Sequence, residues 1–371
     1  MRRLTVVQVL PELESGGVEQ VALDMGRYLA SQGHRSIVIS AGGRMVSPLV
    51  AEGSKHITMD LGRKSLFTLK QVRPLRRLIA EFKPDVIDVL SRMPAWIVYL
   101  ALRGMPTDQR PKWITSVHTL SSVNAYSGIM TRGDRVVVVS NTVKNYIQQS
   151  YPKVDGSKLV LVPRGIDTEY FCHGFQPSEE WLSAWSEQFP QLNDKPLLLL
   201  PGRLSRSKGH ADFISLIHRL KESGCGVHGL IMGEADRSGA KYVAELKAQI
   251  EALGLDDDIS FIGQRSDVRE IMAISRIIYS LSPKPEAFGL TVSEAISLGR
   301  PVLGYAHGGV AEQLDMLLPE GQVKVGNIDE LTDKTLNWLK APPTVLAQKT
   351  FTLERCMEAT VALYGQLAET H

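Results

Sequence analysis

Two glutamates eight positions apart, Glu286 and Glu294, stand in a stretch with the sequence Pro-Glu-Ala-Phe-Gly-Leu-Thr-Val-Ser-Glu-Ala. The stretch follows an apolar run and leads into a helical pattern, so we expect the first carboxylate in a loop and the second in a helix. Glu286 could accept hydrogen bonds from sugar hydroxyls and Glu294 from a ribose. N–H groups near Gly289, Leu290 and Thr291 would face a phosphate. The alternative is a helix that merely begins with acids near its positive end.

A glycine-rich basic loop, 202–209, has the sequence Gly-Arg-Leu-Ser-Arg-Ser-Lys-Gly and follows the apolar run 197–200. Glycines allow close approach of the backbone, a helix start offers free N–H groups, and Arg203 and Lys208 add positive charge. This combination suits a diphosphate. The Gly-x-x-x-x-Gly-Lys-Ser/Thr spacing is absent, which disfavours hydrolysis of Mg-ATP. A solvated basic turn is the alternative.

Near the N-terminus, residues 15–17 are Ser-Gly-Gly and open another helical pattern. The Gly-x-Gly-x-x-Gly spacing is absent, and the apolar run 36–40 is not followed by an acidic residue. A dinucleotide cofactor is therefore not expected. Instead, Gly16 and Gly17 are expected to let a substrate approach the backbone of the first half.

His118 follows the stretch 113–117, which is predicted to be a strand, and should lie at the carboxyl end of that strand. A lone histidine is more often structural, but ligands bind at the carboxyl ends of parallel strands, which favours a role in a site. No histidine pair has metal-binding spacing, and the acidic triplet 256–258 is interpreted as a solvated turn. The three widely separated cysteines indicate neither a disulfide framework nor a zinc site.

These residues require a scaffold that brings the ends of several strands together. In the first half, strands are predicted at 4–10, 36–40, 86–90, 113–117, 135–139 and 159–162, with helical spacing between them. The pattern restarts in the second half, at 197–200, 227–232, 259–262, 277–281 and 301–304. The predicted fold class is α/β, with two facing Rossmann-like, doubly wound domains and a cleft between the carboxyl ends of their sheets.

The length of 371 residues also favours two domains. We predict an N-terminal domain at 1–175, a polar linker at 176–195 and a C-terminal domain at 196–345. The final segment, 346–371, is expected to form a helix that packs back on the N-terminal domain.

Net charge and the lengths of the apolar runs argue against nucleic-acid-binding, membrane-spanning and secreted proteins. The net charge of +2, from 42 Lys+Arg and 40 Asp+Glu, argues against nucleic acid as a partner. No apolar run approaches the roughly 18 residues of a spanning helix. The apolar start at 4–7 is interrupted at Gln8 before the hydrophobic region of a signal peptide can form. A cytoplasmic location is expected.

Between Arg63 and Lys83, seven basic residues and one acid, Glu81, are interleaved with apolar residues. Such a segment can lie on an anionic membrane surface, with about 1 kcal/mol from each basic residue near it. The alternative is an ordinary domain helix with a basic outer face.

The order and spacing of the motifs resemble the retaining GT-B glycosyltransferases of family 4, from about residue 4 to 330. The resemblance rests on the glycine pair, the two glutamates, and the motifs at 163–167, 202–209 and 307–309 with Glu312. The segments 91–96 and 126–140, together with His118, resemble the branch that adds sugars to bacterial lipopolysaccharide core and related glycolipids.

The resemblance implies a role for each matching position. Arg203 and Lys208 would neutralise a diphosphate leaving group, Glu286 would hold the donor sugar, and Glu294 the ribose. His118 would contact the transferred sugar near its anomeric carbon, and Gly17 and His118 would bind the acceptor. The implied donor-binding residues are Gly16, Gly17, Arg164, Gly202, Arg203, Lys208, Gly233, Ile262, Phe288, Gly289, Leu290, Thr291 and Glu294.

The implied reaction moves a sugar from a UDP- or GDP-linked donor to a lipid-linked saccharide at the inner face of a bacterial membrane. The glycosidic bond would break through an oxocarbenium-like state, and the acceptor hydroxyl would attack from the leaving-group face. A phosphate oxygen would take its proton. Arg, Lys and N–H groups would offset the departing charge, so no metal ion or cofactor is expected.

Two positions depart from the pattern of the family, in which many members have Asn at Arg164 and Gly at Thr119. Arg164 could add a phosphate contact or a domain-closing salt bridge. Two alternatives stay open: a nucleotide-sugar 2-epimerase of the same architecture, which converts its donor without an acceptor, and a non-catalytic nucleotide-sugar sensor. The intact pair of glutamates counts against the sensor.

Overall fold

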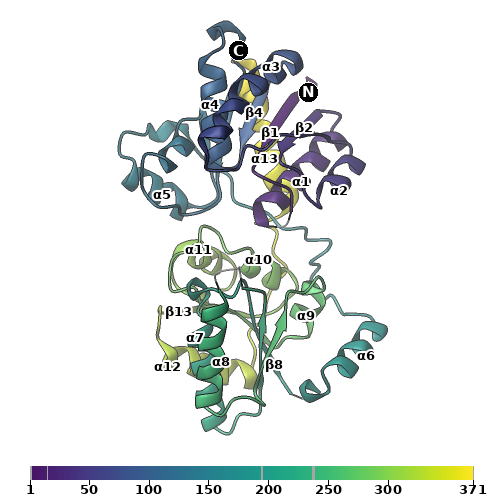
Figure 1. Cartoon of the computed structure of the whole chain (residues 1–371). Helices are drawn as coiled ribbons and strands as arrows, with labels where there is room; N and C mark the ends of the chain where they lie inside the picture. Colours follow the sequence, from purple (N-terminus) through teal and green to yellow (C-terminus); the bar gives the residue numbers. More distant parts are fainter. Residues whose placement is uncertain (1, 15, 194, 236–238, 371) are drawn as a thin grey trace. The chain divides into compact units, whose positions relative to one another are not determined.

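The computed structural model describes residues 2–14, 16–193, 195–235 and 239–370, which form two compact units. The first unit contains Met1–Pro163 and Glu354–His371, and the second contains Arg164–Leu353. Figure 1 follows the chain through both units, and the yellow C-terminal helix lies among the purple and blue elements of the first.

The first unit is built on a seven-stranded parallel sheet with the order β3-β2-β1-β4-β5-β6-β7. Its strands are β1 (Thr5–Val9), β2 (Arg35–Ser40), β3 (Lys55–Thr58), β4 (Val86–Val89), β5 (Lys112–Val117), β6 (Arg135–Val138) and β7 (Leu159–Leu161). Its α-helices are α1 (Gly17–Ser31), α2 (Val46–Ala51), α3 (Val72–Phe82), α4 (Arg92–Arg103), α5 (Asn141–Ser150) and α13 (Leu353–Glu369). Short 3₁₀ turns are η1 (Leu66–Gln71), η2 (Thr107–Gln109), η3 (Ser127–Thr131) and η4 (Gly156–Lys158).

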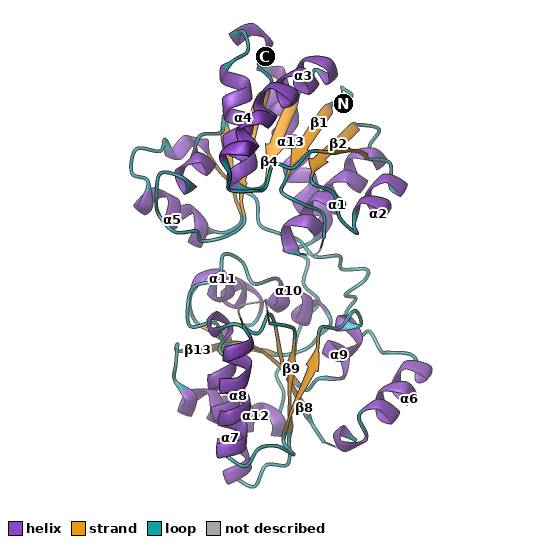
Figure 2. Ribbon diagram, viewed as in Figure 1, coloured by secondary structure: helices purple, strands orange, loops and turns teal. Residues whose placement is uncertain are grey.

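Alternation along the strands assigns the helices of the first unit to the two faces of its sheet. Val7 and Val9 of β1 pack in one apolar cluster with residues of α3 and α4. Ile37 and Ile39 of β2 belong to the same cluster, whereas Val38 between them packs in another cluster with residues of α1 and α2. Successive side chains of a strand point to opposite faces, so the helices cover both faces, as Figure 2 shows.

The C-terminal helix α13 supplies a polar contact beneath the sheet. Its buried Tyr364 donates a hydrogen bond from Oη to Asp88 Oδ2 at 2.7 Å, and Ser116 Oγ donates to Asp88 Oδ1 at 2.9 Å. Burial raises the pKa of Asp88 from 3.8 to about 6, and both hydrogen bonds oppose that rise. The last helix is therefore a structural part of the first unit.

The second unit is built on a six-stranded parallel sheet with the order β10-β9-β8-β11-β12-β13. Its strands are β8 (Leu197–Pro201), β9 (His228–Met232), β10 (Ile259–Gly263), β11 (Ile277–Ser280), β12 (Val302–Tyr305) and β13 (Gln322–Val323). Its α-helices are α6 (Glu179–Gln188), α7 (His210–Glu222), α8 (Ala240–Ala252), α9 (Val268–Ile274), α10 (Leu290–Ser297), α11 (Gly308–Leu317) and α12 (Ile328–Lys340). Three 3₁₀ turns are η5 (Pro190–Leu192), η6 (Arg206–Lys208) and η7 (Pro319–Gly321).

The predicted fold class of two doubly wound parallel α/β domains is confirmed. In each sheet the strand order reverses beside the first strand, between β1 and β4 and between β8 and β11. Loops after the strands next to such a reversal are where open α/β sheets bind ligands. The edge strands β3 and β13 were not predicted.

The segment predicted as a polar linker, 176–195, contains α6 and η5. Trp185 of α6 is 6% exposed and belongs to the apolar core of the second unit, and its ring stacks on that of Trp181 at 5.2 Å between centroids. The chain divides upstream of this segment, between Pro163 and Arg164.

Candidate functional site

The predicted phosphate loop follows β8 in the second unit and is fixed by backbone hydrogen bonds between strand ends. Gly202 N donates to Met232 O at 2.8 Å, and Gly233 N donates to Gly263 O at 2.9 Å. The loop closes at Gly209, which has φ +76°, and a Cβ there would lie 1.9 Å from the carbonyl oxygen of Leu281. Only glycine fits this position, so the course of the loop into α7 depends on it.

Within this loop, Lys208 is directed to the first of the two glutamates. Its Nζ lies 2.7 Å from Glu286 Oε1, and both side chains are half-buried. Ser282 also donates a hydrogen bond to the same carboxylate oxygen. The structure thus joins two motifs that are 78 positions apart into one charged pair.

The segment 307–309 packs against the loop that carries Glu286. Gly309 N donates to Glu286 O at 2.8 Å, and His307 Nε2 lies 2.7 Å from Ser282 O. A Cβ at Gly309 would lie 2.5 Å from the Cα of Phe288. The close backbone contact explains why residue 309 is glycine. Together with the hydrogen bond to Glu286 O, it fixes the backbone of Glu286.

The second glutamate, Glu294, lies in α10, which begins after Gly289 at φ +92°. Leu290 and Thr291 are the first residues of that helix, where N–H groups lack partners within the helix. Burial raises the pKa of Glu294 from 4.5 to about 7, while the guanidinium of Arg164 opposes the rise. Arg164 therefore acts on this glutamate within the second unit.

The remaining donor-side predictions differ in exposure. Arg203 is exposed beside Gly202, whereas Ile262 and Phe288 are 8% and 5% exposed and pack with apolar neighbours. Their burial makes their side chains part of the core of this unit. Ligand contacts at these two positions would come mainly from the backbone.

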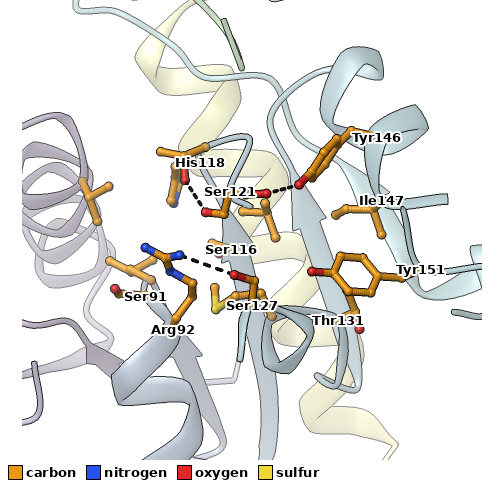
Figure 3. A pocket seen from close by; sticks show the side chains of 15 residues that line it. Ser91, Arg92, Ser116, His118, Ser121, Ser127, Thr131, Tyr146, Ile147 and Tyr151 are labelled. Carbon is orange, nitrogen blue, oxygen red and sulfur yellow. Dashed lines mark hydrogen bonds between the residues drawn. The ribbon is translucent and has the colours of Figure 1, made fainter. Parts of the chain in front are cut away.

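In the first unit, a pocket of about 240 Å³ lies at the carboxyl ends of β4 and β5. It is lined by His118 and by Val18, which follows the glycine pair, so the structure brings these two predicted regions together. Gly16 precedes α1 and Gly17 is its first residue, whereas Ser15 lies outside the described residues. Figure 3 shows His118 on one side of the pocket and Arg92 below it.

Sequence reasoning missed most of the lining of this pocket. Arg92 and Ser91 stand at the start of α4, while Ser127, Tyr146 and Tyr151 come from η3, α5 and the residue after α5. The segment 91–96 entered the sequence argument only through a family resemblance. This segment directly follows the predicted strand 86–90. A position at the carboxyl end of a predicted strand is also what indicated His118.

No group of three or more His, Cys, Asp or Glu side chains in the described ranges is arranged to hold a metal ion. None of the helices in those ranges is both long and apolar enough to cross a bilayer.

Two family profiles match the chain in succession. Glycosyltransferase Family 4 matches residues 15–170, and Glycosyl transferases group 1 matches residues 183–351. The two matches fall on the two halves that the motifs distinguished.

Curated relatives differ in how much of the chain they match. The trehalose synthase of Pyrococcus horikoshii is 30% identical over 202 residues, and the match spans 53% of this chain and about half (47%) of the relative. The N-acetyl-alpha-D-glucosaminyl L-malate synthase of Bacillus anthracis is 31% identical over 88% of this chain and 85% of its own length. The lipopolysaccharide core biosynthesis mannosyltransferase LpcC of Rhizobium leguminosarum bv. viciae is 22% identical over 75% and 73%.

Solved structures resemble the chain over its whole length. A glycosyltransferase from Rickettsia africae ESF-5 superposes with a TM-score of 0.87 at 28% identity, with all of both chains covered. Anabaena Alr3699/HepE, solved with UDP and glucose, has a TM-score of 0.78 at 19% identity over 99% of each chain, a likeness of fold alone.

Proposed function

The chain belongs to the GT-B glycosyltransferases of family 4, and from this membership we propose that it transfers a sugar from a nucleotide-sugar donor to a hydroxyl group of an acceptor. The observation that carries the proposal is the pair formed by Lys208 and Glu286, 2.7 Å apart at the strand ends of the second unit. A cation for a diphosphate and an acceptor of sugar hydrogen bonds are thereby held side by side.

The proposed donor is a UDP- or GDP-linked sugar. Arg203 and Lys208 face its diphosphate, N–H groups at the start of α10 add partial positive charge, and Glu294 accepts hydrogen bonds from the ribose. The UDP held by the Anabaena protein of the same fold supports this class of ligand. Glu286 exchanges its contact with Lys208 for hydroxyls of the sugar when the donor binds.

We propose that transfer retains the configuration of the anomeric carbon. The bond between that carbon and the diphosphate breaks through an oxocarbenium-like state, and the acceptor hydroxyl attacks from the same face. A phosphate oxygen takes the proton of the hydroxyl, and His118 contacts the transferred sugar. Fixed cations and N–H groups stabilise the departing diphosphate because they need little reorganisation.

The same charges lead us to propose a reaction that requires no divalent metal ion. Excess EDTA should leave turnover within about twofold, since Arg203 and Lys208 supply the charge that a metal would otherwise supply. Loss of activity on chelation, with recovery on addition of Mg²⁺ or Mn²⁺, would contradict this part of the proposal.

For the acceptor, we propose a lipid-linked saccharide of the cell envelope, as in lipopolysaccharide core synthesis. The resemblance of 91–96 and 126–140 to that branch supports it, since both segments contribute residues to the pocket of the first unit. The match to LpcC adds weaker support.

We further propose that the protein binds transiently to the anionic inner face of the bacterial membrane, through η1. In the segment 63–83, α3 buries Leu75 and Ile79, which fits an ordinary domain helix. By contrast, Leu66 and Phe67 of η1 are 84% and 73% exposed, and Lys70 Nζ lies 4.9 Å from the Phe67 ring. Exposed apolar side chains beside basic ones suit a membrane surface.

Co-sedimentation with vesicles of phosphatidylglycerol tests the membrane proposal. Replacing Leu66 and Phe67 with Ser together should lower the bound fraction several-fold, whereas Val50→Ser, an exposed control on α2, should not. Equal binding of all three proteins, or no binding by any, would overturn it.

The transfer proposal is tested with the double variant Arg203→Ala plus Lys208→Ala. A thermal-shift screen of UDP- and GDP-sugars first selects a donor, and the double variant should lose both the shift and transfer to a glycolipid extract. Lys241→Ala plus Lys247→Ala, on exposed positions of α8, is the matched control. Full activity in the loop variant would refute the phosphate-binding role. Conversion of the donor without an acceptor would favour the 2-epimerase.

A further inference from the structure

The pocket of the first unit is positively charged and rich in hydroxyls. None of its fifteen lining residues, all within the described ranges, is Asp or Glu, whereas Arg92 and His118 both line it. Eight of the others carry a hydroxyl group: Ser91, Ser116, Thr119, Ser121, Ser127, Thr131, Tyr146 and Tyr151. Three of these hydroxyls already donate within the protein: Ser116 to Asp88, Thr131 to the carbonyl of Gly128 and Tyr146 to the carbonyl of Ser121. The lining itself contributes no carboxylate.

Arg92 has weak partners for a half-buried guanidinium. Its Nη1 lies 3.4 Å from Ser127 Oγ, and its Cζ lies 5.5 Å from the centroid of the Tyr126 ring. In the part of the chain that the structure describes, no carboxylate lies within ion-pair distance of it. The half-buried Arg265 and Arg269, by contrast, lie 2.7 and 2.6 Å from carboxylate oxygens of Asp267 and Glu270.

Two further features add positive potential at the same place. Lys64 Nζ lies 5.2 Å from the Tyr126 ring, on which Arg92 also packs. Arg92 is also the first residue of the twelve-residue helix α4, whose N-cap residue Ser91 makes no side-chain capping bond. The first N–H groups of such a helix carry partial positive charge. An anion in this pocket would therefore meet a guanidinium, a helix start and several hydroxyls.

We propose that this pocket binds an oxyanion of the acceptor, a carboxylate or a phosphate monoester, through the guanidinium of Arg92. The planar fork of Arg matches both groups with two parallel hydrogen bonds. Figure 3 shows the guanidinium extended into the pocket, on the side opposite Tyr146 and Tyr151. The inference rests on the proposed transfer function, because it names the chemical class of the acceptor: an acidic or phosphorylated sugar rather than a neutral one.

Three monosaccharides that differ in one group test the inference: glucose, glucuronate and glucose 6-phosphate. Their binding to the full chain is measured by calorimetric titration in the Arg203→Ala plus Lys208→Ala background, so that the loop of the second unit contributes little. One anionic sugar should bind at least tenfold more tightly than glucose. Preference for glucuronate identifies a carboxylate, and preference for glucose 6-phosphate identifies a phosphate. Equal binding of all three would overturn the proposal.

The variant Arg92→Met should lose this preference, whereas Arg77→Met, at an exposed position on α3, should keep it. If Arg92→Met does not fold by circular dichroism, Arg92→Lys serves in its place. Lys is a point charge without the fork, so the variant should reduce the preference for the anion at least threefold while glucose binding stays unchanged. An unchanged preference in either folded Arg92 variant would overturn the proposal.

These results are separable from the transfer proposal. UDP binding and donor hydrolysis are read with the native loop of the second unit, and the Arg92 variants should leave UDP affinity unchanged. Intact UDP binding without anion preference refutes only the acceptor class. Anion preference without UDP binding refutes only the donor assignment.

Discussion

In the second unit, Lys208 and Glu286 lie 2.7 Å apart, whereas in the first unit the partners of Arg92 among the described residues are a hydroxyl and an aromatic ring. Asp88 of the first unit likewise accepts hydrogen bonds from two hydroxyls, of Ser116 and Tyr364, and Ser116 lines the same pocket as Arg92. The second unit thus holds its charges as a pair, whereas in the first unit Arg92 lines the pocket and Asp88 is buried outside its lining, each with neutral partners.

The difference shows two ways of preparing a charged site. Pairing keeps Lys208 and Glu286 oriented before a ligand arrives, and their exchange of partners limits the cost of binding a donor. A charge with neutral partners is available to a ligand at once, but burial of such a charge destabilises the fold. The following variants test each side of this contrast.

Breaking the paired site should have the largest effect. Lys208→Met removes one cation that stabilises the leaving diphosphate and leaves Glu286 without its ion-pair partner. Turnover should fall about 10²- to 10³-fold, as for the loss of one group that stabilises developing negative charge. Steady-state kinetics with the selected donor measures it, with Lys247→Met on α8 as the control. A fall of less than threefold would remove the distinction between the two sites.

The buried carboxylate of Asp88 should make the stability of the first unit depend on pH. Because the pKa of Asp88 is raised from 3.8 to about 6, the folded protein favours the protonated form, and stability declines as pH rises through 6. Asp88→Asn removes this decline. Relative to wild type, the variant should gain about 2 kcal/mol between pH 4 and pH 8, because part of the effect is already present at pH 4.

Differential scanning calorimetry at both pH values measures this gain as a shift of the unfolding midpoint. Asp108→Asn, at an exposed position in η2, is the control and should show no such dependence. A midpoint difference between Asp88→Asn and wild type that is the same at pH 4 and pH 8 would contradict the prediction.

The smallest effect is expected at Glu294, whose burial is partly compensated by Arg164. Its pKa of about 7 means that about one carboxylate in ten is ionised at pH 6. If the ionised form accepts the ribose hydroxyls, UDP affinity should fall about tenfold from pH 8 to pH 6. Calorimetric titration of UDP measures it.

Glu294→Gln is the reference for this pH series, since any dependence that remains in it comes from the phosphate of UDP. The same tenfold fall in both proteins would show that Glu294 does not titrate in donor binding.

The sequence predicted those parts of the candidate site that are local in the chain. Strand ends, glycines and nearby charges identified Lys208, Glu286 and His118 as candidates, because loops after parallel strands share one edge of the sheet. The pairing of Lys208 with Glu286 spans 78 positions and depends on how β8 and β11 lie together. The importance of Arg92 is a property of its surroundings, namely that no described carboxylate lies within ion-pair distance of it.

The fold was predicted where hydrophobic runs are long. The strands β3 and β13 were missed because Lys55–Thr58 and Gln322–Val323 are short and acquire their strand geometry from one neighbour each. The polar segment 176–195 resembled a linker because α6 has few apolar residues, yet Trp185 fixes it to a core. The interleaved basic and apolar residues of 63–83 likewise could not show which apolar side chains are exposed, as Leu66 and Phe67 are.

The C-terminal helix α13 has a consequence for synthesis of the protein. The first unit begins at the N-terminus, but its fold includes Glu354–His371, and Tyr364 from that segment closes the hydrogen bonds of Asp88. On the ribosome, the continuous second unit, Arg164–Leu353, has all its strands available while the first still lacks its last helix. The half of the protein that is made first is therefore completed only after α13 has been synthesised.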